Sequence, residues 1–187
     1  MNTYIAILRG INVSGKNKIK MERLREVLRV AGLQSVQTYI QSGNIIFQTE
    51  SNKPGELATI ISGAIQKEWG YEVSTLVLTR EEVIAAKENN PFYKKNPEID
   101  ITKLCVTFME NIPDEKLRNA ITLPTNCKDF FEIQGKQIFL YCPGGFGRTK
   151  LTNNFFERRL EQTCTTRNWK TIDKLIQLSH HSQTNRP

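Results

Sequence analysis

The stretch VQTYIQSGNIIFQT, residues 36–49, decides the fold of the first half of the chain. Residues 36–40 and 45–49 are rich in β-branched and aromatic side chains, and Ser42-Gly43 between them is a dipeptide typical of a hairpin turn. Two strands joined by so short a turn run antiparallel, whereas parallel strands need a long crossover connection. The stretch therefore predicts an antiparallel sheet.

The elements on either side of this hairpin complete a β-α-β-β-α-β unit. Residues 4–8 form a short apolar run that predicts a buried strand, and apolar side chains recur at helical spacing over residues 21–31. After the hairpin, a second helical stripe begins beyond Pro54, and residues 73–78 predict the last strand. We expect this unit to occupy residues 1–79.

The second half of the chain has the same order of elements without a close sequence repeat. Its predicted elements are a strand over 103–109, a helix over 113–121, a hairpin over 130–133 and 137–141, a helix over 153–160, a strand over 163–167 and a last helix over 171–178. Between the halves, residues 80–100 hold a short helix and then a polar segment with two prolines, 89–97, which predicts a linker. The expected fold class is α+β, with two tandem ferredoxin-like units and antiparallel sheets, residues 1–79 and residues 101–187, the second with an extra C-terminal helix.

The composition limits the functional classes that fit the chain. It has 187 residues and a formal net charge of +7, and 39% of the residues are hydrophobic and 24% charged, as in ordinary soluble globular proteins. No apolar run approaches the roughly 20 residues of a membrane span, and the first residues lack the pattern of a signal peptide. We expect a cytoplasmic protein that does not bind membranes.

The cysteines and histidines argue against a metal site. The four cysteines are widely separated and the two histidines are adjacent: Cys105, Cys127, Cys142 and Cys164, and His180 and His181. Zinc ligands are clustered and disulfide frameworks belong to small secreted chains, so we expect reduced thiols and no metal. The scarcity of histidine also argues against Ser-His or Cys-His catalysis.

Glycine, asparagine, hydroxyl and cationic residues gather in two loops of each predicted unit. In the first unit these loops follow the first strand and form the hairpin turn, and in the second they follow the third and fourth strands. Each pair shares one edge of such a fold, and we expect the two edges to face a common cleft that binds a ligand. The predicted ligand-binding residues are Arg9, Gly10, Asn12, Gly15, Lys16, Gln41, Ser42 and Asn44 in the first unit, and Arg148, Lys150, Arg167 and Asn168 in the second.

The first of these loops is similar to a nucleotide-binding motif. Residues 10–17 read G-x-x-x-x-G-K-N, which differs from a Walker A motif in having Asn17 where Ser or Thr would hold magnesium. The predicted helix begins only near Met21, and a β-hairpin rather than a parallel repeat follows it. We therefore interpret the match as a chance one. Backbone N–H groups between glycines, flanked by three cations, nevertheless suit an anion.

Structural roles compete with ligand binding at several of these positions. A plain turn is the favoured role of Ser42-Gly43, and core packing at a helix start is favoured over ligand stacking for Trp169. The loop 144–150 suits either a surface connection or an anion site before a helix N-terminus, with Thr152 as the N-cap. The two edges also suit a purely structural role, which is to lock the lobes together.

Four motifs in order resemble a known family. They are LRGIN with GKNK at residues 8–12 and 15–18, TYIQSGN at 38–44, GRTKLT at 147–152 and TTRNW at 165–169. With them the chain resembles the bacterial family catalogued as domain of unknown function 1697, from Tyr4 to about Leu178, with Ser14 and Thr149 as mild departures. The resemblance implies two ferredoxin-like α+β lobes, and it brings no established activity, cofactor or catalytic residue.

Three functions fit these observations. The favoured one is binding of a phosphorylated or otherwise anionic small molecule, such as a nucleotide. The alternative is nucleic-acid binding, which suits a basic chain, although residues 44–48 lack the paired aromatic side chains that stack bases. A further alternative is an enzyme of unknown reaction with Lys16 or Ser42 as nucleophile, and any cofactor is left open.

The excess positive charge lies in the two segments that carry the motifs. Residues 9–29 contain seven basic and two acidic residues, a net charge of +5, and residues 148–170 contain six and two, a net charge of +4. The rest of the chain is therefore at −2. Because a positive potential attracts anions, a binding site is expected first in these two segments.

Overall fold

The computed structural model describes residues 1–13 and 15–184, which form two compact units. The first unit consists of Met1–Ile84 together with the C-terminal segment from Lys174, and the second consists of Ala85–Asp173. The sequence predicts a boundary at residue 79 and groups the C-terminal helix with the second half. In the structure that helix contributes residues to both units.

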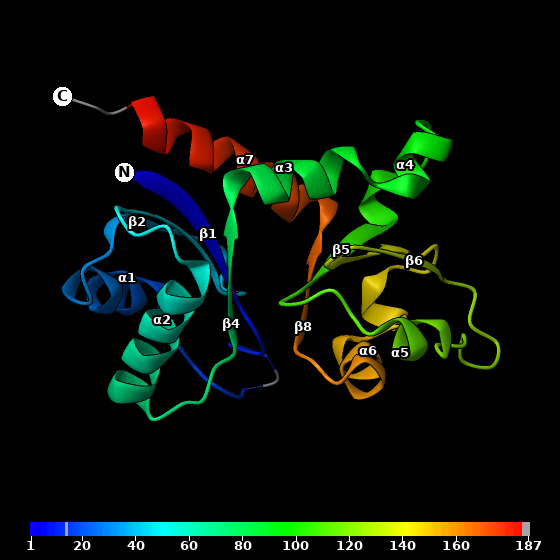
Figure 1. Cartoon of the computed structure of the whole chain (residues 1–187), viewed down its shortest axis with the longest axis horizontal. Helices are drawn as coiled ribbons and strands as arrows, with labels where there is room; N and C mark the ends of the chain where they lie inside the picture. Colours follow the sequence, from blue (N-terminus) through cyan, green and yellow to red (C-terminus); the bar gives the residue numbers. More distant parts are fainter. Residues whose placement is uncertain (14, 185–187) are drawn as a thin grey trace. The chain divides into compact units, whose positions relative to one another are not determined.

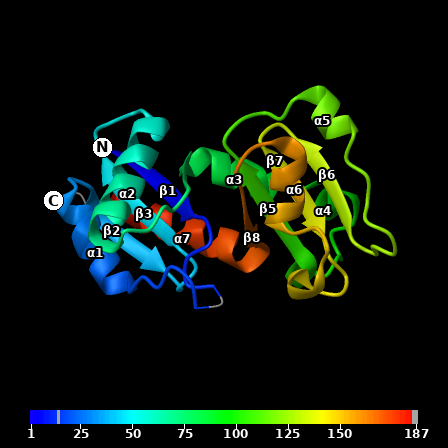
Figure 2. The ribbon, with the colours of Figure 1, turned by 90° about the horizontal axis from the view of Figure 1, so that it is seen from below.

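The first unit is built around a four-stranded antiparallel sheet. Its elements are β1 (Asn2–Leu8), α1 (Met21–Val30), β2 (Gln34–Tyr39), β3 (Asn44–Thr49), α2 (Pro54–Trp69) and β4 (Thr75–Thr79). The strands lie in the order β2-β3-β1-β4, and each neighbouring pair is antiparallel. Helices α1 and α2 lie side by side along the sheet (Figure 1 and Figure 2).

The central strand β1 is buried on both of its faces. Tyr4, Ala6 and Leu8 pack in one core with the apolar stripes of α1 and α2. The intervening Ile5 and Ile7 are almost completely buried as well. A strand with two buried faces has a continuous apolar run rather than an alternating one, and this explains the pattern from which the strand was predicted.

The second unit is built around a second four-stranded antiparallel sheet, with the strand order β6-β7-β5-β8. The elements that follow β4 are α3 (Arg80–Glu88), α4 (Pro91–Lys95), η1 (Ile101–Lys103), β5 (Leu104–Met109), α5 (Glu115–Asn119), β6 (Phe130–Gln134), β7 (Gln137–Tyr141), η2 (Phe146–Arg148), α6 (Asn153–Leu160), β8 (Cys164–Asn168) and α7 (Trp169–Thr184). From β5 to β8 the order of strands and α-helices repeats that of the first unit. The predicted α+β class with two antiparallel sheets is confirmed.

Aromatic side chains fill the core between the second sheet and α6. Cys105 and Met109 of β5 belong to this core together with Phe156 of α6. The ring of Phe156 meets those of Phe131 and Phe155 edge-on, with centroid separations of 5.5 Å and 5.1 Å. Such edge-to-face pairs contribute beyond the area that they bury, and the Phe131–Phe156 pair joins β6 to α6, whereas Phe155 lies on α6 itself.

The predicted linker over residues 89–97 contains the short helix α4. Asn90 precedes it, is completely buried, and accepts hydrogen bonds through Oδ1 from the backbone N–H groups of Phe92 and Tyr93 at 3.0 Å and 3.2 Å. Pro91 occupies the first turn of the helix, where its missing N–H is not needed. Asn90 and Pro91 therefore start a helix in a segment whose composition is typical of a linker.

Candidate functional site

The end of β1 and the β2–β3 hairpin lie at one edge of the first sheet. The last pair between β1 and β3 joins Ile7 to Asn44. Ile7 lies near the end of β1, just before the glycine-rich loop, and Asn44 begins β3, just after the hairpin turn. The two loops that are predicted to share an edge therefore do so. We call residues 9–20 and 40–44 the first-unit edge.

Gly43 brings the hairpin into close contact with β1. Its carbonyl oxygen accepts a hydrogen bond from the backbone N–H of Leu8 at 2.8 Å. A Cβ atom at this position would lie 2.6 Å from Cβ of Leu8 and 2.9 Å from Cδ1 of Ile11, and the φ angle of +75° lies in the left-handed region. Only glycine fits here, in agreement with the turn role that the sequence favours.

The loop after β1 folds back on itself. Among its described residues, four have left-handed φ angles, namely Gly10, Asn12, Gly15 and Asn17. The backbone N–H of Lys16 donates to the carbonyl oxygen of Val13 at 3.0 Å, and that of Asn12 donates to the carbonyl oxygen of Asn17 at 3.1 Å. Glycine and asparagine adopt such φ angles most readily, so the composition of the loop has a conformational cause.

The side chain of Asn12 clamps this loop onto the hairpin. Its Nδ2 donates to the carbonyl oxygens of Ile19 and Gln41 at 2.9 Å and 2.8 Å, and its Oδ1 accepts from the backbone N–H of Ile19 at 2.9 Å. Asn17 adds a weaker brace, because its Nδ2 donates to the carbonyl oxygen of Gly10 at 3.2 Å. Both donors and one acceptor site of the Asn12 amide are used by the backbone, so Asn12 positions the loop.

Asn44 has a comparable structural role in the hairpin. It is completely buried, and its Nδ2 donates to the carbonyl oxygen of Tyr39 at 3.1 Å and to Oγ of Ser42 at 2.9 Å. These bonds close the turn from within. A buried amide that bonds its own turn shapes the hairpin, whereas orienting a ligand requires donors that face solvent.

The exposed part of the first-unit edge is cationic. Gly15, Lys16, Lys18 and Gln41 are exposed, and Arg9 is half-buried. Helix α1 begins at Met21, five residues after Lys16, and Lys20 before it makes no side-chain cap. In a P-loop the lysine stands at the helix start, so the local geometry agrees with the interpretation of the Walker-like match as chance.

A second edge lies in the second unit, where β5 begins and β7 and β8 end. Leu104 pairs with Tyr141, and Cys105 pairs with Asn168. We call residues 142–152 and 165–169 the second-unit edge. The predicted neighbourhood of the exits of the third and fourth strands of this unit is thus present.

Hydrogen bonds to residues 125–129 hold the loop that follows β7. The hydroxyl of Thr149 donates to Oδ2 of Asp129 at 2.5 Å, and Nζ of Lys150 donates to the carbonyl oxygen of Thr125 at 2.9 Å. Thr152 accepts from the backbone N–H of Phe155 at 3.2 Å, which confirms it as the N-cap of α6. Arg148, in contrast, is exposed at the end of η2.

The residues after Thr165 serve the structure of β8 and α7. Arg167 is buried, and its Nη1 donates to Oγ1 of Thr165 at 3.0 Å and to the carbonyl oxygen of Thr166 at 2.9 Å. Oδ1 of Asn168 accepts from the backbone N–H of Thr171 at 2.9 Å, in the first turn of α7. Trp169 is buried at the start of that helix, and core packing is therefore confirmed as its role.

The predicted site residues thus fall into two groups within their units. Those that hold the loops or elements together through their own side chains are Asn12, Ser42, Asn44, Lys150, Arg167 and Asn168. Of these, Lys150 and Asn168 are nevertheless exposed, and the other exposed residues at an edge are Gly15, Lys16, Gln41 and Arg148. Gly10 and Arg9 are half-buried between these groups. An anion that meets either edge therefore encounters lysine, arginine and backbone groups first.

Two contributors to these edges were not predicted from the sequence. Asn17, which departs from the Walker A motif, braces the loop. An asparagine in a glycine-rich loop, where left-handed φ angles are common, is the signal for this role. Asp129 fixes Thr149 from 20 residues away, and no local pattern indicates such a contact.

Two of the thiols are unreactive at neutral pH, and the described residues hold no cluster that suits a metal ion. Burial raises the pKa of Cys105 to about 12 and that of Cys142 to about 11, so both thiols stay protonated at neutral pH. Over the described residues, no three His, Cys, Asp or Glu side chains come together in a way that suits a metal ion. Among the helices described, none combines the length and apolar character needed to cross a membrane.

Comparisons with known proteins relate this chain to a family model and to a solved structure. A family model described as "Protein of unknown function (DUF1697)" matches residues 1–139. The solved structure of the conserved bacterial protein SP0830 from Streptococcus pneumoniae is similar, with a TM-score of 0.74 and 28% sequence identity over 96% of this chain and 99% of that one. A search of curated proteins found no match.

Proposed function

We infer that the chain, which belongs to the family of proteins of unknown function DUF1697, binds a phosphorylated or otherwise anionic small molecule. We place the binding at the first-unit edge, with Lys16 as the main cation. Each sheet with its helices is proposed to be a ferredoxin-like unit, which the strand orders β2-β3-β1-β4 and β6-β7-β5-β8 support. Ligand binding at the second-unit edge is assigned to Arg148.

The preformed loop after β1 is the observation that carries this proposal. Asn12 and Asn17 hold the backbone of the loop at Ile19 and Gly10, so these parts of it do not have to be ordered when a ligand arrives. Consecutive turns with left-handed residues leave backbone N–H groups on one side of a loop, and such concave surfaces bind anions. Lys16 and Lys18 are exposed beside them, and the segment 9–29 has a net charge of +5.

The test is a ligand screen followed by titration of matched variants. Thermal shift is measured with inorganic phosphate, nucleotides and phosphosugars, and any hit is titrated by calorimetry against the parent chain, Lys16→Ala and Arg148→Ala. The control is Lys67→Ala, which removes an exposed lysine from the last turn of α2 in the first unit.

We expect Lys16→Ala to weaken binding about tenfold, because it removes a hydrogen bond to a charged group. Lys67→Ala is expected to leave the affinity unchanged. The proposal fails if none of these ligands raises the melting temperature of the parent chain, or if Lys16→Ala and Lys67→Ala weaken binding equally.

A second candidate function, binding of single-stranded nucleic acid, is favoured by an aromatic pair in the second unit. The rings of Phe130 on β6 and Tyr141 on β7 are stacked, with centroids 5.9 Å apart and planes inclined by 18°, and Phe130 is 52% exposed. Stacking of bases on such rings is a common mode of single-strand recognition. The third strand of the first unit, by contrast, has no pair of aromatic side chains over residues 44–48.

Oligonucleotide binding distinguishes the two candidates. If the chain binds nucleic acid through this pair, fluorescence anisotropy with a labelled single strand yields an affinity that falls steeply with salt and is reduced by Phe130→Ala. Saturable binding of one small anion at moderate salt, with Phe130→Ala unaffected, supports the small-molecule function instead.

A further inference from the structure

A polar pocket lies at the other end of β1 from the glycine-rich loop. It is lined by residues 1–4 and by residues 79–81, where β4 passes into α3, and its volume is about 320 Å³. All of these residues belong to the first unit, and Tyr4 pairs with Thr79 beside the pocket. Because β1 rises by about 3.3 Å per residue, its seven residues separate the pocket from the first-unit edge by roughly 20 Å.

Two residues that line this pocket each carry a buried polar atom that has no hydrogen-bond partner in the described part of the chain. The atoms are Oγ1 of Thr3 and Nε of Arg80. Thr3 is 8% exposed, and the side chain of Arg80 is 12% exposed. Buried polar groups in folded proteins are almost always paired, so two unpaired donors on residues that line one cavity point to a ligand.

The charge of Arg80 is poorly compensated as well. Within the described residues, the only carboxylate oxygen in an ion pair with its guanidinium is Oε1 of Glu81, at 4.0 Å from Nη1, and Glu81 is 76% exposed. Nη2 of Arg80 contacts Nε2 of His180 on α7. A guanidinium only donates hydrogen bonds, so the imidazole acts as acceptor and does not neutralise the charge.

The neighbouring Glu82 is engaged elsewhere. Its Oε2 accepts from the backbone N–H of Thr79 at 2.8 Å, and Oγ1 of Thr79 accepts from the backbone N–H of Glu82 at 3.1 Å. This is a reciprocal capping box at the start of α3. The acid that is nearest in sequence after Glu81 is thus used to start the helix, and the buried cation is left for another partner.

We propose that this pocket binds a small anion through its carboxylate or phosphate group. One ligand oxygen accepts from Nε of Arg80, and the same or a second oxygen accepts from the hydroxyl of Thr3. The volume exceeds that of an inorganic anion, so the pocket has room for an organic part of the ligand as well. This site is separate from the proposed function at the first-unit edge and does not depend on it.

The test uses the full chain and the substitution Thr3→Val, with Thr3→Ser as the matched control. Valine has the shape of threonine without the hydroxyl, whereas serine keeps the hydroxyl. The probes are inorganic phosphate and propionate at constant ionic strength. Their binding is measured by calorimetry and by the chemical shifts of the amide resonances of Thr3 and Arg80 in labelled protein.

We expect phosphate, propionate or both to bind and to shift these two resonances. Thr3→Val is expected to weaken binding about tenfold and to raise the melting temperature of the ligand-free protein, because it removes an unpaired buried hydroxyl. Thr3→Ser keeps the affinity. Binding of phosphate alone assigns a phosphate ligand, and binding of propionate alone assigns a carboxylate.

Three results would overturn the inference. The first is that neither probe moves the resonances of Thr3 and Arg80. The second is that Thr3→Val lowers the melting temperature of the ligand-free protein, since the hydroxyl then has a partner within the chain. The third is that Lys16→Ala abolishes binding of the probes while Thr3→Val leaves it intact; in that case the proposed function stands and this pocket is not a site.

Discussion

At the scale of single residues, Gly43 is required at the first-unit edge for its lack of a side chain. We predict that Gly43→Ala lowers the free energy of unfolding by about 3 kcal/mol, because alanine is strained at positive φ and its Cβ would overlap Leu8. Gly15 has a similar φ of +77° with nothing near its Cβ position, so Gly15→Ala is expected to cost only about 1 kcal/mol. Urea denaturation measures both, and equal losses would contradict the role of the contact.

The polar residues of the edges also show where prediction from sequence ends. Asn12, Asn44 and Asn168 were predicted from their type and loop position to meet a ligand. In the structure each of them bonds backbone groups of its own unit. Residue type indicates that an amide needs partners, but whether these are backbone or ligand depends on contacts between segments that are distant in the sequence.

At the scale of elements, helix α2 contains a glycine that the structure does not need. Gly63 lies in its interior, has no left-handed φ, and a Cβ there would meet nothing within 4 Å. We predict that Gly63→Ala stabilises the chain by about 0.5–1 kcal/mol, since alanine loses less conformational freedom in a helix. A rise in the urea midpoint checks this, and an unchanged or lower midpoint would show that Gly63 has a role in packing.

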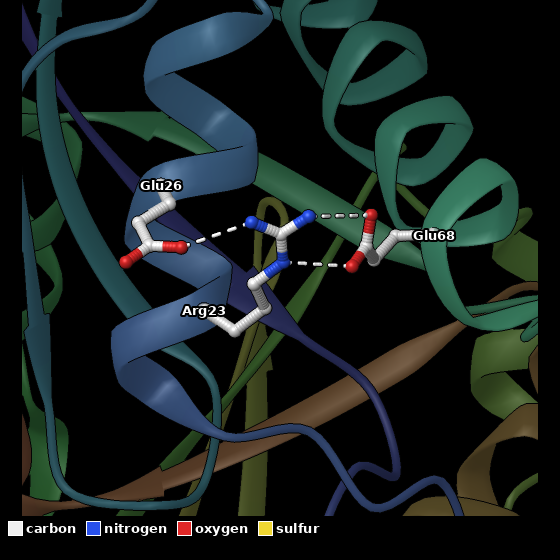
Figure 3. Close-up of polar contacts among 3 residues, drawn as sticks. All are labelled: Arg23, Glu26 and Glu68. Carbon is white, nitrogen blue, oxygen red and sulfur yellow. Dashed lines mark hydrogen bonds and ion pairs between the residues drawn. The ribbon is translucent and has the colours of Figure 1, made fainter.

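Helices α1 and α2 are joined by an ion pair that is sensitive to acid. Arg23 on α1 donates from Nε and Nη2 to the two carboxylate oxygens of Glu68 on α2, at 2.7 Å and 3.1 Å, and from Nη1 to Glu26 at 3.0 Å (Figure 3). The hydrogen bonds from Arg23 lower the pKa of Glu68. A lowered pKa contributes stability that is complete above the ordinary pKa of glutamate and is lost as the pH falls through the lowered one.

From this we predict a pH-dependent effect of Glu68→Gln. The variant is less stable than the parent chain at neutral pH. The difference begins to shrink as the pH falls below about 4.3, the ordinary pKa of glutamate, and disappears below the lowered pKa of Glu68. Chemical denaturation at a series of pH values measures it. Glu56→Gln, which removes a partner of Lys53 at the start of α2, is the control for a local pair that does not join two helices. A difference that persists unchanged at pH 3 would exclude the ion pair as its cause.

The elements themselves were predicted better than their boundaries. The antiparallel sheets follow from two hairpins. The apolar strands and the apolar faces of the helices are visible in local patterns, because their side chains must be buried in any fold. Helix α5 is shorter than predicted and covers only Glu115–Asn119, and α4 occupies a segment that was predicted to be a linker. Both are five-residue helices, too short for a periodic pattern, so their caps rather than their hydrophobic spacing indicate them.

At the scale of the whole molecule, the four thiols differ in accessibility. Cys105, Cys142 and Cys164 are buried, and Cys127 is half-buried. We predict that iodoacetamide at pH 8 modifies Cys127 in the folded chain and the other three only after unfolding, because burial raises the pKa of Cys105 and Cys142 far above that pH. Peptide mass mapping with and without urea tests this. Modification of Cys105 at the rate of Cys127 would show that the second core opens in the native state.

The net charge of +7 is distributed over both units. The basic segment 9–29 belongs to the first unit and the basic segment 148–170 to the second, so each unit has its own cationic region. This much is readable from the sequence alone. The common cleft that was expected between the two edges stays a prediction.

The division of α7 between the units has a consequence for how the chain is made. The first unit needs Met1–Ile84 and the segment from Lys174, and these are separated by the 89 residues of Ala85–Asp173. At translation rates of about 5–20 residues per second, the ribosome takes roughly 5 to 20 seconds to synthesise the intervening part. The second unit is therefore complete in the nascent polypeptide before the first, and the part of the protein that is translated first is the last to be completed.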